Sequence, residues 1–158
     1  MAYSAYAVAN AFIQRARERG VNDLTPMKLQ KLLYLAQAWN IKVLGQPLLD
    51  DHFSRWQYGP VIPAMYHEFK DFGARPINRM ATTLAAATNG DFAQIPIIPE
   101  HDRISWSLID AVLNRYGHLD GYQLGNLTHQ MGSGWAANGG RADGSVITID
   151  EMMRDQNV

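Results

Sequence analysis

The sequence predicts a mainly α-helical domain: a compact bundle of about five to six helices with one short two-stranded β-ribbon. Three stretches, residues 3–19, 26–44 and 102–116, carry apolar side chains at helical spacing. A glycine follows each stretch directly, as is common where a helix ends. With 158 residues, of which 47% are hydrophobic, one domain with a single core is the natural expectation.

The first helix, over residues 3–19, presents one apolar face. Arginines crowd its end, where cations interact favourably with the helix macrodipole, and Gly20 ends it. The residues of the apolar face are Val8, Ala9, Phe12, Ile13 and Ala16.

The second helix, over residues 26–44, has clear start and stop signals. The Thr25 side chain can accept a hydrogen bond from a free backbone N–H, and the proline that follows gives up no helical hydrogen bond. Gly45 suits the left-handed conformation that follows many helices. The apolar stripe is broad and leaves Leu35 and Ile41 outside it, so we expect this helix to be buried on more than one side. The stripe consists of Leu29, Leu32, Leu33, Ala36, Trp39 and Val43.

The middle of the chain is predicted to mix extended and helical segments. Residues 46–58 are expected to be irregular with a short strand at 52–58, after which Pro60 opens a third helix over 60–72. Residues 80–94 predict a short helix followed by a turn at Asn89-Gly90-Asp91.

The ribbon of the predicted fold uses the segment that follows. Each proline in Ile95–Pro99 favours an extended conformation for the residue before it. We therefore expect residues 94–98 to pair with residues 52–58.

Two further helices and a loose tail are expected in the last third. The helix at 102–116 is predicted to point its apolar residues inward, and a shorter helix covers 120–130. A glycine-rich stretch follows at 132–145. Thr148 and Glu151 have the spacing of a capping box and predict a last short helix. The inward-pointing residues of 102–116 are Ile104, Leu108, Ile109, Val112 and Leu113.

Composition limits the classes of function. Residues 1–45 carry a charge balance of +4 and residues 46–158 one of −5, which favours attraction within one fold over nucleic-acid binding. No apolar run is long enough to span a membrane, and the N-terminus lacks the basic leading region of a signal peptide. The absence of cysteine excludes disulfides and zinc–thiolate sites and fits a cytoplasmic protein.

Three motifs stand out in the sequence. The first, L-T-x-x-K-L-Q-K-L-L-Y-x-A, is present from Leu24 to Ala36, and the second, W-x-x-G-P-V-x-P-x-x-Y-x-x-F, from Trp56 to Phe69. The third, L-x-x-L-T-H … W, is present from Leu124 to His129 with Trp135 behind it. By these motifs the chain resembles the Panacea-domain antitoxin family, whose SocA-like members are also described as phage-associated proteins.

The resemblance implies a protein-interaction domain at residues 1–137, followed by a glycine-rich extension at 138–158. It implies an antitoxin that binds and neutralises a co-encoded toxin and that can act as an adaptor presenting the toxin to a ClpXP-type protease. Neither an enzyme activity nor a cofactor is expected. The C-terminal residues 156–158 could serve as an accessible tail for such an adaptor.

The candidate partner-binding residues lie on two segments. Trp56 and Tyr58 precede Gly59-Pro60, and aromatic rings on an ordered connector either pack in the core or form a docking surface. Lys28 and Lys31, one turn apart, are expected on a polar face of the second helix. There they would either confer solubility or speed association with an acidic partner. The predicted set is Lys28, Lys31, Trp56, Tyr58, Gly59 and Pro60.

The alternative is a small hydrolase or ligand-binding protein that uses His67, His129 and nearby carboxylates. His67-Glu68 begins like a zinc-protease helix, but position 71 is aspartate instead of the second histidine. We therefore predict no metal site. An enzyme would gather the two histidines in one pocket, whereas an interaction module would leave them apart and expose aromatic surface.

Overall fold

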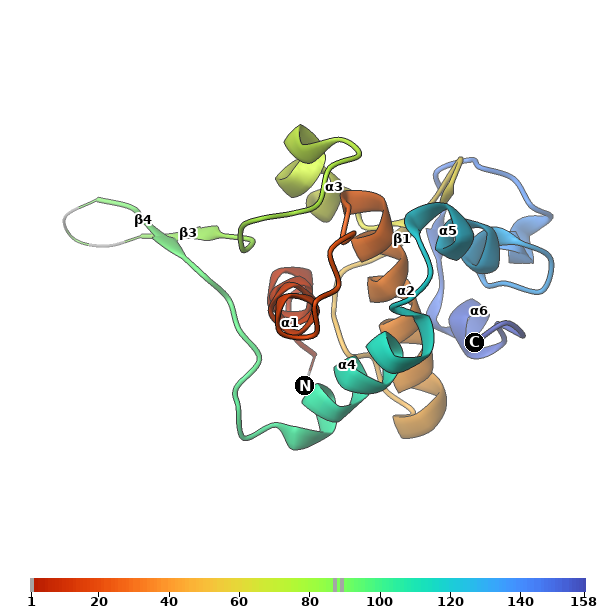
Figure 1. Cartoon of the computed structure of the whole chain (residues 1–158). Coiled ribbons are helices and arrows are strands. Elements are labelled where there is room, and N and C mark those ends of the chain that lie inside the picture. Colours follow the sequence, from red (N-terminus) through yellow and green to blue (C-terminus); the bar gives the residue numbers. More distant parts are fainter. Residues whose placement is uncertain (1, 87, 89) are drawn as a thin grey trace.

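The computed structural model describes residues 2–86, 88 and 90–158, and these are mainly α-helical with small antiparallel sheets (Figure 1). The mainly α prediction is confirmed, but a three-stranded sheet and a projecting hairpin accompany the helices. The helices are α1 (Ala5–Glu18), α2 (Pro26–Leu44), α3 (Pro63–Phe69), α4 (Arg103–Tyr116), α5 (Gly121–His129) and α6 (Ile149–Met153), with short 3-10 turns η1 (Lys70–Phe72) and η2 (Trp135–Asn138). The strands are β1 (Phe53–Trp56), β2 (Gly59–Val61), β3 (Thr83–Ala85), β4 (Phe92–Gln94) and β5 (Val146–Ile147).

Helix α2 is the centre of the molecule and packs against each of the other five α-helices and against the strand β2. Its predicted ends are confirmed. Thr25 accepts from the Lys28 backbone N–H, and Gly45 caps the helix with φ 73°. Every residue from Lys28 to Ala38 is buried, which confirms burial on more than one side. Polar side chains in that stretch must therefore find partners within the protein.

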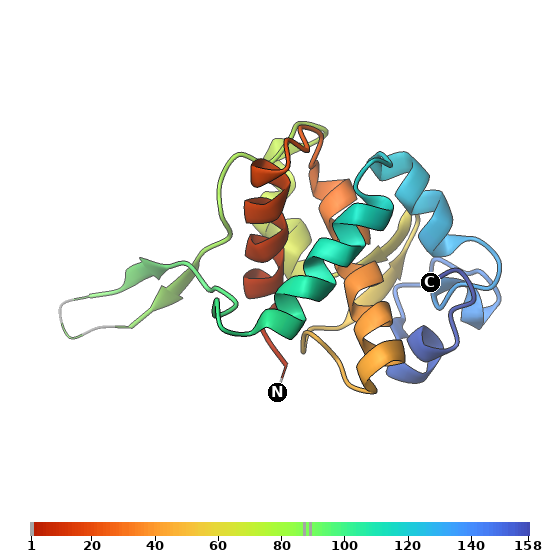
Figure 2. The same ribbon diagram turned by 60° about the horizontal axis from the view of Figure 1, so that its bottom comes forward.

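Helices α1 and α4 cover one side of α2 (Figure 2). The predicted apolar face of α1 is buried. Arg15 and Arg19 each reach Asp110 of α4 at 3.1 Å, so the basic first part of the chain pairs with the acidic second part. The inward prediction for Ile104 is wrong, because it is 66% exposed while the first turn of α4 buries Ser105 and Trp106 instead.

The predicted β-ribbon is wrong in its partner. Strand β1 pairs with β2, with Trp56 opposite Gly59, and with β5, with Phe53 opposite Ile147. It does not pair with residues 94–98. Strand β1 pairs with β2 and not with residues 94–98 because a tight turn joins β1 to β2, and closing a short loop costs less conformational entropy than closing a long one.

Helix α3 begins later than predicted. Pro60 lies in β2, and the helix starts at Pro63. Ile62, the residue before Pro63, has the extended conformation that a following proline favours (φ −88°, ψ 111°). Both prolines are compatible with a helix start, and the pairing of β2 with β1 decides between them.

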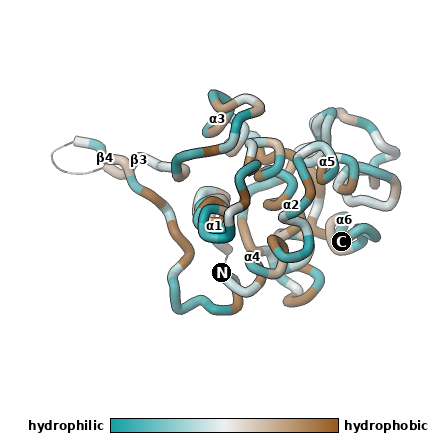
Figure 3. The backbone as a smooth tube through the Cα atoms, viewed as in Figure 1, coloured by the Kyte–Doolittle hydropathy of each residue, from teal (hydrophilic) through white to brown (hydrophobic). Residues whose placement is uncertain are grey.

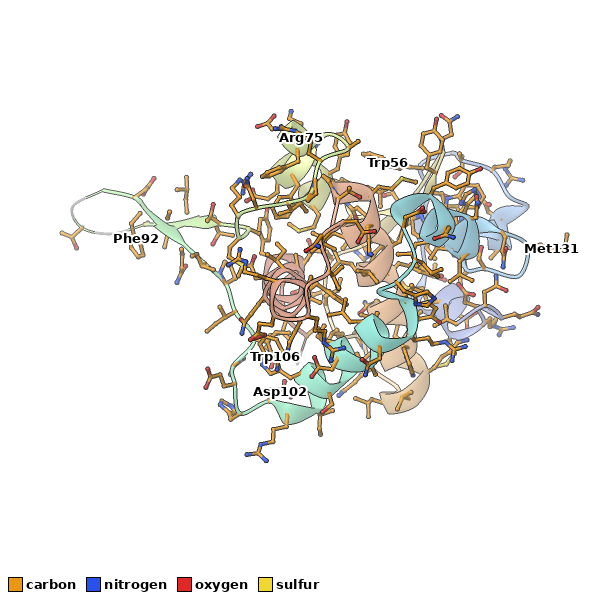
Figure 4. All side chains as sticks on the ribbon, viewed as in Figure 1. Trp56, Arg75, Phe92, Asp102, Trp106 and Met131 are labelled. Atoms are coloured by element: carbon orange, nitrogen blue, oxygen red, sulfur yellow. The ribbon has the colours of Figure 1, made fainter. Side chains whose placement is uncertain are left out.

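The described part of residues 80–94 contains the strands β3 and β4 instead of the predicted helix. Strands β3 and β4 pair with each other, and the hairpin projects away from the helical body (Figures 1 and 2). Its return leg toward α4 is largely apolar (Figure 3), and Phe92 lies well out along it (Figure 4). At the base, the Asn10 side-chain amide donates to Ala81 O (3.0 Å) and Pro96 O (2.8 Å). The predicted turn at Asn89 lies outside the described residues.

The C-terminal residues pack on the side away from this hairpin (Figure 1). The capping box of Thr148 and Glu151 at the start of α6 is confirmed. Asp155 is buried and accepts from Tyr34 Oη (2.6 Å) and the Gly134 backbone N–H (2.9 Å). Lys42 Nζ donates to Val158 O at 2.7 Å, which holds the last residue against α2. The division of the chain at residue 137 stays a prediction.

Candidate partner-binding groove

A groove of about 450 Å³ lies between the start of α2, the β1–β2 turn and α3–η1, and we call it the aromatic groove. Its lining is mostly apolar. Met27 comes from α2, Trp56 and Tyr58 from β1 and the turn, and Tyr66 from α3. Figure 4 shows Trp56 at this edge of the body, far from Phe92 on the hairpin.

The aromatic rings form one wall of the groove, in which some rings contact each other and some are largely exposed to solvent. Trp56 and Tyr66 meet edge to face with centroids 5.0 Å apart, a favourable geometry for aromatic pairs. Tyr58 is 63% exposed and Tyr66 is 45% exposed. Rings of this kind bury much area for little loss of side-chain entropy, which suits them to protein contacts.

Glycine is required at the turn that carries this wall. Gly59 has φ 118°, in the region that L-residues rarely adopt. A Cβ at this position would also lie 3.1 Å from Lys31 Cε and 3.3 Å from Thr128 Oγ1. The turn therefore passes so closely over α2 and α5 that a side chain at residue 59 would push against both.

Polar side chains of α2 hold this turn and the strand after it. Lys31 Nζ donates to Pro60 O at 3.0 Å. The Gln30 amide donates to Ile62 O (3.0 Å) and accepts from the Ile62 backbone N–H (2.9 Å). The first motif thus fixes the backbone of the second.

The predicted exposure of Lys28 and Lys31 is wrong. Their exposed fractions are 0% and 1%, because α2 is surrounded on all sides. Lys28 Nζ donates to Asp23 Oδ1 (2.7 Å) and Gly117 O (2.6 Å). Burial lowers the pKa of Lys31 to about 7 by disfavouring its charged form. Neither lysine is free to act as a solvated surface charge.

Helix α5 and the loop after it contact and support residues that line the groove. Gly121 and Gly125 allow a close approach to α2, since a Cβ at residue 125 would lie 3.0 Å from Met27 Cε. The Trp135 indole N–H donates to Trp56 O at 3.0 Å, which anchors the strand at the start of the turn. The third sequence motif therefore contacts residues of the first two, although none of its own residues lines the groove.

The family model of the antitoxin SocA-like, Panacea domain matches residues 29–136. The chain is also similar to Antitoxin SocA of Caulobacter vibrioides (strain NA1000 / CB15N), with 31% identity over 156 residues, covering 96% of this chain and 81% of that protein. The chain belongs to the Antitoxin SocA-like, Panacea domain family. No solved structure matches it significantly.

The two histidines of the alternative function have separate neighbours in this Panacea-domain protein. His67 is exposed on α3 and stacks edge-on against Tyr66. His129, at the end of α5, stacks against Trp135, and its Nδ1 contacts Gly125 O. Neither lines the aromatic groove. Membership of an antitoxin family favours a non-catalytic protein.

Within residues 2–86, 88 and 90–158, no group of three or more histidine, aspartate or glutamate side chains is placed to hold a metal ion. In the same part of the chain, the helices are too short or too polar for a membrane span.

Sequence reasoning missed several residues of the groove. Met27, Gln30, Tyr66 and Lys70 all line it. Gln30 carried a usable signal, because a polar residue in a helix buried on more than one side needs an internal hydrogen-bond partner. Met27 and Lys70 carried none, since only the meeting of α2 with η1 places them together.

Proposed function

We propose that this protein is an antitoxin that binds and neutralises a co-encoded toxin, and that the aromatic groove is its toxin-binding surface. One observation carries the proposal: two of the three segments by which the chain resembles its family line this groove, and the third holds its turn through the hydrogen bond from Trp135 to Trp56. The similar protein from Caulobacter vibrioides bears the name Antitoxin SocA, which supports a toxin as the partner.

The predicted partner-binding residues take two roles in this proposal. Trp56 and Tyr58 contact the toxin directly, because their rings face the groove. Gly59, Pro60 and Lys28 shape the surface, since all three are buried. Inhibition then requires only that the bound antitoxin covers or distorts the active region of the toxin.

A matched pair of tyrosine variants tests the groove. Tyr58→Ala removes a ring that is 63% exposed in the groove, and Tyr122→Ala removes one that is 71% exposed on α5 outside it. Loss of a central aromatic contact costs about 2 kcal/mol, or roughly 30-fold in affinity. Each variant is co-expressed with the product of the neighbouring gene, and co-purification, calorimetric affinity and rescue of growth are measured.

The expected result is that Tyr58→Ala weakens toxin binding and rescue while Tyr122→Ala leaves both intact. Thermal unfolding should be almost unchanged in both variants, because each ring is largely solvent-exposed. Equal binding by both variants would move the toxin to another surface. No binding of the neighbouring product by the unmodified chain would refute the antitoxin assignment for this pair.

The adaptor role stays a separate part of the proposal. If the antitoxin delivers its toxin to a ClpXP-type protease, co-expression shortens the lifetime of the toxin, and removal of the protease restores it. The suggested tail at residues 156–158 is held in place, since the Gln156 backbone N–H donates to Gly132 O at 2.8 Å. A protease would therefore need to act on the toxin or first release this segment.

A further inference from the structure

The aromatic groove has a one-sided charge. Both of its charged lining residues are lysines, Lys31 at the base and Lys70 on η1, and its described lining holds no carboxylate. Apolar walls around a cation strengthen its attraction to an anion, because little water screens the pair. The groove is therefore complementary to a ligand that combines apolar surface with negative charge.

The ammonium of Lys31 is the less satisfied of the two buried lysines of α2. Lys28 Nζ has a carboxylate partner, Asp23 Oδ1, as well as Gly117 O. Lys31 Nζ donates to Pro60 O, and no carboxylate among the described residues lies within ion-pair distance of it. An ammonium has three donors, and a buried charge is costly unless it is paired.

We propose that the groove receives a segment of the partner protein in which an Asp or Glu stands beside a large apolar residue, and that this carboxylate pairs with Lys31. The apolar side chain packs against Trp56 and Tyr58, and the carboxylate accepts from Lys31 Nζ. Tyr58 is largely exposed on a turn, so its side chain can move to admit the segment. The inference rests on the proposed function, because it gives the chemistry of the toxin segment.

Protonation gives the pairing a signature. Burial lowers the pKa of free Lys31 to about 7, and a bound carboxylate would raise it. Binding above about pH 7 therefore takes up a proton from solvent, and affinity falls as the pH rises through the bound-state pKa. The other titratable residues that line the groove are Tyr58 from the turn, Tyr66 from α3 and Lys70 from η1, and no carboxylate or imidazole is among its lining residues. Helix α5 brings the neutral Thr128 close to the Lys31 side chain.

The first step of the test selects binders from a displayed library of random peptides, using the full chain as bait. The matched baits are Lys31→Met, which keeps the length and loses the charge, and Arg17→Met, which removes an exposed cation of α1 outside the groove. The expected result is enrichment of Asp or Glu next to aromatic or large aliphatic residues by the unmodified chain and by Arg17→Met. Lys31→Met should lose this enrichment.

Calorimetry on one enriched peptide and its amide analogue is the second step. We expect about a 30-fold or greater loss of affinity when either the carboxylate or Lys31 is removed, as for other desolvated ion pairs. In buffers of different ionisation enthalpy near pH 8, proton uptake should accompany binding to the unmodified chain and disappear in Lys31→Met. If Lys31→Met does not fold, the amide analogue and the proton uptake of the unmodified chain decide alone.

Three results would overturn the inference: no peptide binder at all, binders without carboxylates, or binders that Lys31→Met holds as tightly with the same proton uptake. Binding of the toxin encoded by the neighbouring gene is measured in a separate experiment. If the toxin binds but the peptide results are negative, only the inference about Lys31 fails. If the peptides bind as expected but the toxin does not, the antitoxin assignment fails and the chemistry of the groove stands.

Discussion

Buried Lys31 should make the protein more stable as the pH rises from about 7 to about 9. Its pKa is about 7 in the folded chain, because burial disfavours the ammonium, while an unfolded lysine keeps its proton to about pH 10.4. Across this window the unfolded chain holds a proton that the folded chain has released. The free energy of unfolding therefore increases with pH.

The size of the effect follows from linkage. Each pH unit over which one state holds one more proton is worth about 1.4 kcal/mol, and Lys31 is already half-titrated at the start of the window. The gain between about pH 7 and pH 9 is therefore about 2 kcal/mol. Full burial of the side chain, with 1% exposed, leaves little solvent screening to reduce it.

The assay is urea unfolding at about pH 7, 8 and 9, followed by tryptophan fluorescence and circular dichroism. Lys31→Met should lose the rise in stability, and Lys70→Met, at an exposed groove lysine, should keep it. Other groups that titrate in this range are common to all three proteins and cancel in the comparison. Parallel pH profiles for the unmodified chain and Lys31→Met would refute the reasoning, since they would mean that Lys31 keeps its charge in the folded state.

Three further outcomes are expected from urea and thermal unfolding. Gly59→Ala should lower the free energy of unfolding by about 2–3 kcal/mol, because of its positive φ and its crowding against α2. Gly45→Ala, with open space around it, should lower it by about 1 kcal/mol. Equal losses in the two variants would contradict the close approach of the turn to α2. Tyr34→Phe should cost about 1–3 kcal/mol, because Asp155 stays buried with one donor fewer, and an unchanged midpoint would argue against that bond. Replacing residues 83–94 with a short Gly-Ser linker should change stability by less than about 0.5 kcal/mol, and a large loss would show that the hairpin supports the core.

The helices whose ends are marked by capping residues were predictable from sequence. Thr25, Pro26 and Gly45 set the ends of α2 through backbone hydrogen bonds and φ angles, and these are local properties of the chain. The capping box of α6 is local in the same sense. The hairpin was missed because the alanine-rich residues 84–87 favour a helix and were given the greater weight. The signal for the hairpin was Asn89-Gly90, a pair typical of the turns that join two strands.

The lining of the candidate groove was predictable in its aromatic residues Trp56 and Tyr58, and the burial of its lysines was not. Trp56 and Tyr58 stand beside a Gly-Pro pair, so an ordered aromatic turn could be read from the sequence. Lys28 and Lys31 look like a solvent-facing pair in a single helix. Their burial depends on Gly117 at the end of α4 and on the β1–β2 turn, which lie about 30 to 90 residues away in the sequence. Local sequence patterns do not encode contacts over such separations.

The projecting hairpin has a bearing on handling the protein in the laboratory. From Met80 to Pro99 the sequence contains one charged residue, Asp91, and Leu84 and Phe92 are 77% and 50% exposed. Strands β3 and β4 pair only with each other in the described chain, so the outer edge of each is open, with no lysine to discourage edge-to-edge joining. Concentrated samples should therefore be prone to aggregation through pairing of these strand edges, and Leu84→Lys is the simplest substitution to prevent it.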